Sequence, residues 1–230
     1  MDSTHDHTAA TRLTGVLLLT SLTAMIASAA IVVPSGLTLN PAEPAAALAA
    51  VAARPGLHLI ELGLDVVGWV ALTGSALAMA ARTGPRLALL PAGLLFGAGL
   101  TGMLHDAGNL ALTQLAADAG DATTVTVATA VLLTAKWAVN LTGLLWVAAT
   151  ATAVRYLPLT AGLRRIGAVA ALSGLAAVVL PWTTGINGPS ATQEQLGYAL
   201  HLPIMIWYGV LGWRELRVGS QSREPDVASS

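Results

Sequence analysis

The sequence predicts an all-α integral membrane bundle of about six transmembrane helices, and three observations carry this prediction. Of the 230 residues, 55% are hydrophobic and only 10% are charged, whereas a soluble domain carries about 25% charged residues. The apolar residues form stretches of about 20, the length that crosses a bilayer as a helix. Arginine is concentrated in alternate connections between these stretches, which is the pattern of the positive-inside rule.

Six stretches have the length and hydrophobicity of a spanning helix. They are Leu13–Val33, Leu57–Ala80, Leu87–His105, Val125–Val154, Leu163–Pro181 and Leu196–Trp213. We expect a single domain over residues 1–217 and a polar, disordered cytoplasmic tail over residues 218–230. The first stretch has an apolar run longer than the ~7–15 residues of a signal core, which favours an uncleaved helix.

The basic residues predict the orientation of the chain. With the N-terminus in the cytoplasm, the outer side holds only Arg54, together with the acidic residues Glu43, Asp118, Asp121 and Glu194. The inner side holds Arg12, Arg82, Arg86, Arg155, Arg164, Arg165, Arg214, Arg217 and Arg223. An even number of spans returns the C-terminus to the cytoplasm. We therefore expect a multi-pass protein of the cell membrane, the inner membrane in bacteria, with both termini inside.

Polar and ionisable residues inside the apolar stretches are the main functional signal. A charged group at the centre of a bilayer costs at least about 2.5 kcal/mol, so such groups are usually paired or functional. His58, Glu61 and Asp65 share one face of the second stretch, because their spacings match the helical repeat. Further polar groups lie in three other stretches: His105, Asp106, Asn109, Lys136, Asn140 and His201. All fall in the outer half or near the midplane, which predicts one outward-facing polar cavity.

This cluster suggests an intramembrane enzyme that performs acid–base chemistry on a hydrophobic or amphipathic substrate, of lyase, cyclase or hydrolase type. A carboxylic acid desolvated in a bilayer keeps its proton more easily and can protonate a substrate. The expected catalytic residues are Glu61, Asp65, His105 and Lys136. The expected substrate-binding residues are His58, Trp69, Asp106, Asn109, Trp137, Asn140, His201 and Trp207. The deep tryptophans would line a pocket able to stabilise positive charge.

Structural explanations exist for the same residues. Lys136 can pair with Asp65 or Glu61 and simply join helices. His58 and His105 can sit at the headgroup boundary, and Asp106 can be an interfacial residue near its helix end. His201 can donate to a carbonyl freed by Pro203. His58, Glu61, His105 and His201 could also supply nitrogen and oxygen ligands to a metal, but their spacing matches no known metal signature, so no metal is assigned.

Composition excludes several classes of protein. The chain has no cysteine, so it has no disulfide, thiolate metal site or cysteine nucleophile. A formal net charge of −1 gives no electrostatic basis for binding nucleic acid. The expected partners are therefore the lipid bilayer and a hydrophobic small molecule, with a homodimer left open and the cofactor unknown.

Several segments resemble a family of uncharacterised six-pass bacterial membrane proteins, a domain of unknown function. They are Arg12–Leu17, Leu59–Leu62, Tyr156–Pro158, Leu163–Gly167 and Ala171–Gly174. His105–Asn109 departs from that family's pattern. The resemblance implies a six-pass fold but no activity, and it transfers no functional residues.

A non-catalytic protein is the alternative function. Glu61, Asp65, His105 and Lys136 would then form a proton relay or a site that binds or transports a small molecule or ion. A transporter needs a polar route on the inner side too, and the inner halves of the stretches are apolar. A third alternative is a membrane partner of another protein without any site.

Overall fold

The computed structural model describes residues 3–82, 87, 89–185, 188 and 190–221, and over these residues the chain forms helices joined by short connections, with no strand. This confirms the predicted all-α class. Two short elements, α2 (Pro44–Ala53) and the 3₁₀ turn η2 (Ala116–Asp118), accompany six long helices. The long helices are α1 (Ser3–Ser35), α3 (Pro55–Arg82), α4 (Leu89–Leu115), α5 (Ala122–Tyr156), α6 (Ala161–Trp182) and α7 (Ala191–Gln221).

Five of the long helices, α1, α3, α5, α6 and α7, are long and apolar enough to cross a membrane. α4 has 27 residues, but its second half carries His105, Asp106 and Asn109, which lower its hydropathy. It also continues to Leu115, beyond the predicted end at His105. At the other end of the chain, α7 continues through Gln221, so residues 218–221 are helical rather than part of a disordered tail. The rest of that predicted tail lies outside the described residues.

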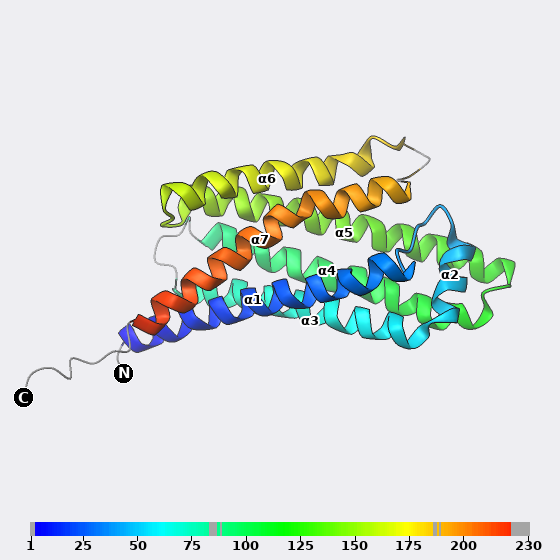
Figure 1. Ribbon diagram of the computed structural model, residues 1–230, viewed down its shortest axis with the longest axis horizontal. Coiled ribbons are helices and arrows are strands. Elements are labelled where there is room, and N and C mark those ends of the chain that lie inside the picture. Colours follow the sequence, from blue (N-terminus) through cyan, green and yellow to red (C-terminus); the bar gives the residue numbers. More distant parts are fainter. Residues whose placement is uncertain (1–2, 83–86, 88, 186–187, 189, 222–230) are drawn as a thin grey trace, which may run out of the picture.

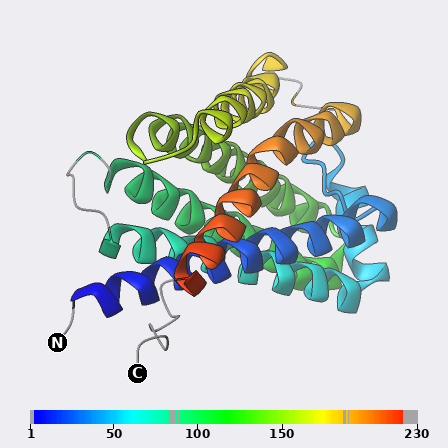
Figure 2. The ribbon, with the colours of Figure 1, turned by 60° about the vertical axis from the view of Figure 1, so that its left-hand side comes forward.

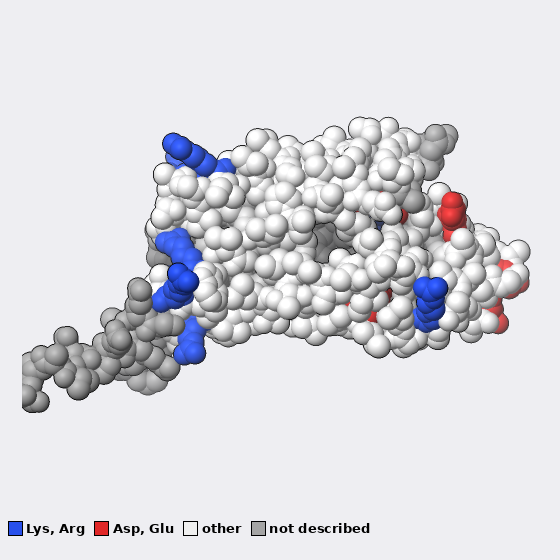
Figure 3. Space-filling view, viewed as in Figure 1, with Lys and Arg blue, Asp and Glu red and all other residues white. Residues whose placement is uncertain are grey.

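The six long helices form a ring in which each packs against the next in the chain and α7 closes against α1 (Figures 1 and 2). Both termini lie at one end of this ring. We call the half of the bundle nearer the termini the proximal half and the other the distal half. The helix ends at the proximal side carry most of the arginines, and Figure 3 shows basic residues gathered there. Arg86 and Arg223 lie outside the described residues.

Small and aromatic residues fill the proximal half. Gly15 and Gly212 let the backbones of α1 and α7 approach closely: a Cβ added to Gly15 would lie 2.7 Å from the Gly212 oxygen. Across the ring, Trp69 and Trp146 make an edge contact at 5.8 Å between centroids, and Trp146 lies 6.0 Å from Tyr208. We call Trp69, Trp146 and Tyr208 the aromatic tier. All three side chains are buried.

The distal end has a cap that the sequence did not predict. The alanine-rich α2 is too short to span, and it begins at Pro44, whose fixed φ suits the first helical position. Its buried face packs against α4, α5 and η2. The resulting apolar cluster consists of Leu37, Ala47, Leu48, Val51, Leu112, Ala116, Ala128 and Leu132. Asp121 starts α5 beside this cap by accepting a hydrogen bond from the Thr124 N–H at 2.8 Å.

Candidate functional site

A cavity of about 240 Å³ lies in the distal half. All six long helices contribute to its wall, together with Leu37 and Leu39 of the α1–α2 connection. Its polar lining is Ser28, Glu61, Asp65, His105, Asn109, Lys136, Asn140, Thr142, Gln193, Glu194, Tyr198 and His201. Trp69 and Trp146 of the aromatic tier also line it. The structure thus brings together most of the residues that the sequence predicted to share one site.

His58 and Glu61 form a buried pair in which Glu61 lines the cavity and His58 lies outside the lining. His58 is fully buried and Glu61 is 5% exposed. The His58 Nδ1 lies 2.9 Å from Glu61 Oε1, and its Nε2 lies 3.2 Å from the backbone oxygen of Asn109. That oxygen can only accept, so Nε2 carries a proton. Nδ1 and Glu61 must therefore share a second proton, either as an ion pair or as a neutral pair.

His105 is held in one tautomer by its two neighbours. Its Nδ1 donates to the backbone oxygen of Ala135 at 2.8 Å, and its Nε2 lies 3.0 Å from the Asn109 side-chain nitrogen. A carbonyl can only accept, so Nδ1 is protonated and Nε2 accepts from the Asn109 amide. The imidazole is therefore neutral in this arrangement. His105 can act as a base only if Asn109 moves away from Nε2.

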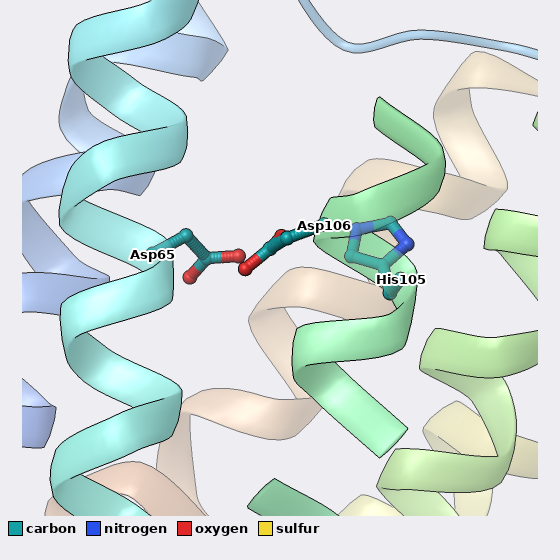
Figure 4. A group of neighbouring side chains, drawn as sticks. All are labelled: Asp65, His105 and Asp106. Atoms are coloured by element: carbon teal, nitrogen blue, oxygen red, sulfur yellow. The ribbon is translucent and has the colours of Figure 1, made fainter. Parts of the chain in front are cut away.

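Asp65 and Asp106 face each other across the α3–α4 contact (Figure 4). The Trp69 indole N–H donates to Asp65 at 3.2 Å, which orients this carboxyl group at the cavity. Asp106 is 1% exposed, and neither of its oxygens accepts a hydrogen bond from a described N–H or O–H group. The group it faces is the carboxyl of Asp65. Asp106 is therefore a buried member of the cluster, and α4 continues for two further turns beyond it.

Lys136 pairs with Glu194, not with Asp65 or Glu61 as the sequence suggested. The ammonium of Lys136 donates to Glu194 Oε1, and the Glu194 side chain is 1% exposed. The sequence placed Glu194 in an outer loop because the apolar stretch begins only at Leu196. In the structure α7 starts at Ala191, which turns Glu194 into the bundle. Glu194 is the main ionisable group of the cavity that the sequence did not place there.

Asn140 and His201 line the cavity from α5 and α7. The Asn140 amide donates to the Val178 oxygen at 2.9 Å and accepts from the Trp182 indole at 2.7 Å. His201 Nδ1 lies 3.2 Å from the Gly197 oxygen, one helical turn back. Pro203 has no N–H, so the carbonyl that it leaves without a helical partner is that of residue 199. The prediction that His201 donates to the carbonyl freed by Pro203 is therefore wrong.

Two predicted tryptophans lie away from the cavity. Trp137 is 42% exposed and makes an edge contact with Trp182 at 6.0 Å. Trp207 is buried in the proximal half, where its indole donates to the Leu163 oxygen at 2.9 Å. Their depth along the sequence suggested a pocket, but depth alone does not say which way a side chain points. Trp146 takes the place they were expected to fill.

Three donors could hold a metal ion. Asp65, His105 and Asp106 each offer one ligand atom, and these atoms lie within 4.8 Å of one another. Mixed nitrogen and oxygen donors suit several divalent metals. The set differs from the sequence-based one, because His58, Glu61 and His201 are not part of it. In the structure, however, the His105 Nε2 is occupied by Asn109.

The chain matches no protein-family model, no curated protein and no solved structure. The resemblance to a six-pass bacterial family therefore remains a prediction.

Proposed function

We propose that the chain is an intramembrane enzyme that performs acid–base chemistry on an amphipathic small molecule held in the distal cavity. The observation that carries this proposal is the pair of facing carboxyl groups, Asp65 at the cavity and Asp106 behind it. Two carboxyl groups in such contact are most stable when they share one proton. One group then serves as an acid while the other is a base, which is the requirement for proton transfer in both directions.

The surroundings support distinct roles for the two carboxyl groups. Asp65 lines the cavity, and its hydrogen bond from Trp69 fixes the carboxyl plane. We therefore assign Asp65 as the group that exchanges a proton with substrate. Asp106 is buried and positions that proton from the opposite side. Glu61 also lines the cavity and, through its shared proton with His58, supplies a second acid–base pair one turn along α3.

Binding without chemistry is the alternative that the experiments must separate. The aromatic tier fills the ring between the cavity and the proximal end. This favours a site with access from the distal half over a transporter, which needs a second polar route. It does not distinguish an enzyme from a receptor or binding protein.

The main experiment compares ligands that co-purify with wild-type protein and with two amide variants. Asp65→Asn and Glu61→Gln keep size and hydrogen bonding but cannot exchange protons. We expect these variants to fold normally and to enrich an unreacted amphiphile that wild-type protein converts. Conversion should fall by about 10²–10⁴-fold, the usual contribution of positioned proton transfer.

Asp121→Asn is the matched control, because it makes the same carboxyl-to-amide change at an exposed position outside the cavity. Mass spectrometry of extracted lipids gives the readout. If all four proteins carry the same unaltered ligand in equal amounts, the protein binds without catalysing, and the enzyme proposal is wrong.

The shared proton has its own test. Infrared spectroscopy should show the carbonyl stretch of a protonated carboxylic acid in wild-type protein at neutral pH. The Asp65→Asn/Asp106→Asn double variant should lose the part of this band that the pair contributes, whereas Asp121→Asn should keep the whole band. Elemental analysis of the same samples provides a second check, because a bound divalent metal would replace the shared proton. Stoichiometric metal in wild-type protein that disappears in the double variant would contradict the proton-sharing pair.

We also infer that the distal half faces outward and that both termini are cytoplasmic. The support is the concentration of arginine at the proximal end. Because the chain has no cysteine, single cysteines report topology directly. Ala42→Cys, before α2, should react with an impermeant maleimide added outside intact cells, and Thr160→Cys, before α6, should not. The reverse pattern would overturn the orientation.

A further inference from the structure

The contact between α1 and α7 is tight in the proximal half. A Cβ added to Gly212 would lie 2.9 Å from the Leu18 Cβ, and one added to Gly209 would lie 2.3 Å from a methyl group of Leu22. These distances leave no room between the two helices. Leu18 and Leu22 therefore mark the face of α1 that meets α7, and Gly209 and Gly212 mark the matching face of α7.

The same two faces separate in the distal half. Val33 lies eleven residues after Leu22, and Tyr198 lies eleven residues before Gly209. Eleven residues are about three helical turns. Val33 therefore lies on the same face of α1 as Leu22, and Tyr198 lies on the same face of α7 as Gly209. Val33 and Tyr198 both line the cavity. Figure 1 shows α1 and α7 crossing near the termini and diverging toward the other end.

This divergence leaves an opening on the side of the bundle. Val33 is 50% exposed and Tyr198 is 52% exposed, although both also line the cavity. They therefore form the rim between the cavity and the surroundings. The space-filling view shows the molecule hollowed on this side, over α1 and α7 (Figure 3). In a spanning bundle, this side faces lipid rather than water. Leu37 and Leu39 line the cavity from the α1–α2 connection, which adds apolar wall at the distal end.

We propose that the gap between α1 and α7 is a lateral portal through which a long-chain amphiphile enters from the bilayer, with its hydrogen-bond-donating head in the cavity and its chain between Val33 and Tyr198. This proposal rests on the proposed function, because it names the class of molecule that the acid–base site receives. The portal joins the apolar phase directly to the polar cluster. An amphiphile is the class of ligand that matches both regions at once.

The charges in the cavity specify the head group. Glu61, Asp65 and Glu194 are acceptors on the wall, and the only Lys or Arg among the lining residues is Lys136. Lys136 is already paired with Glu194. An acceptor-rich wall favours a head that donates hydrogen bonds, an ammonium or a hydroxyl, and disfavours an anion. Trp69 and Trp146 at the cavity add ring faces that favour a cation.

Gly197 provides a way to block the portal without disturbing the fold. It lines the cavity immediately before Tyr198, and a Cβ added there meets nothing within 4 Å. Gly197→Trp should therefore place an indole in the opening. Gly63→Trp is the matched control, because Gly63 is also in a distal helix segment, is exposed, and has nothing within 4 Å of an added Cβ. Gly63 does not line the cavity.

The experiment uses full-length protein in lipid nanodiscs and three photoactivatable probes of equal chain length: a long-chain amine, the corresponding alcohol and the corresponding fatty acid. The amine and the alcohol should label peptides from the distal parts of α1 and α7. The fatty acid should label them about tenfold less, because its head meets like charge. Gly197→Trp should reduce amine labelling about tenfold, while Gly63→Trp should label like wild-type protein.

Two results would overturn the portal. One is equal labelling of wild-type protein and Gly197→Trp; the other is full competition by a short amine without a chain. Neither result bears on whether Asp65→Asn blocks conversion of a co-purified ligand, so the portal and the proposed function can fail separately. Stronger labelling by the fatty acid than by the amine would reject the head-group assignment and the proposal with it.

Discussion

The proximal and distal halves of the bundle use the same six helices and the same neighbours, yet one half is solid and the other hollow. In the proximal half, glycines such as Gly15 and Gly212 allow backbone contact, and large aromatic side chains fill the interior. In the distal half, α1 and α7 diverge and all six helices line a cavity, with polar groups from α1, α3, α4, α5 and α7. The ring topology does not determine whether a cavity forms. The size and charge of residues on the facing stripes do.

The two halves also differ in the number and pairing of their charged side chains. The proximal pair, Arg82 and Glu215, forms one salt bridge at 2.5 Å near the helix ends. The distal half holds the Lys136–Glu194 and His58–Glu61 pairs together with Asp65 and Asp106. Acidic groups outnumber fixed cations there, so protons or a bound ligand must balance the charge. The proximal half thus resembles a structural seam, and the distal half a binding site.

The largest expected effect tests the difference in packing. Gly15→Leu should prevent stable folding, because its Cβ would lie 2.7 and 2.8 Å from backbone atoms of Gly212 and Leu216. The loss of folding free energy should exceed the ~1–3 kcal/mol of ordinary overpacking, because the backbone cannot move aside as a side chain does. Gly197→Leu should fold like wild-type protein. Thermal unfolding in detergent compares the two, and similar stability of both variants would contradict the solid–hollow contrast.

The next effect concerns the distal ion pair. Lys136→Met should destabilise the protein by about 3 kcal/mol, because it leaves Glu194 buried without its cation. The double variant Lys136→Met/Glu194→Gln should recover most of this loss. Denaturant unfolding supplies the measurement. Should Lys136→Met/Asp65→Asn recover stability instead, then Asp65 rather than Glu194 is the partner of Lys136.

A smaller effect is expected at the boundary between the halves. Trp69→Phe keeps a ring in the aromatic tier but removes the hydrogen bond to Asp65. Stability should fall by about 1 kcal/mol, the usual net contribution of one hydrogen bond. Any catalytic rate should fall more than stability does, because the orientation of Asp65 is lost. Equal binding and turnover by Trp69→Phe and wild-type protein would mean that this hydrogen bond has no role in the site.

The smallest effect on stability is expected at the start of α5, at the distal end of the bundle. The backbone N–H of Thr124 donates to Asp121 and lowers the pKa of this exposed carboxyl. A carboxyl with a lowered pKa in the folded state contributes stability above its unfolded pKa and loses it as the pH falls through the folded value. Asp121→Ala should therefore be slightly less stable than wild-type protein at neutral pH and indistinguishable in strong acid. A difference that grows on acidification would reject this explanation.

Much of the fold could be predicted from the sequence, because membrane helices are specified by local properties. Apolar length places each span, and the turns of helix between His58, Glu61 and Asp65 align them on one face. The predicted boundaries fail where helices continue beyond the apolar run, as at the polar end of α4 and at both ends of α7. Backbone hydrogen bonds within a helix do not require apolar side chains, so hydropathy underestimates helix length.

By itself, the sequence determined the helical class, the segregation of arginine and the gathering of polar groups at one depth. Only the tertiary structure decided which of those groups meet. It paired Lys136 with Glu194, faced Asp65 with Asp106, and turned Trp137 and Trp207 away from the cavity. Depth follows from counting residues along one helix. Partners depend on how six helices are rotated about their own axes, and that rotation is fixed by the packing of all their surfaces together.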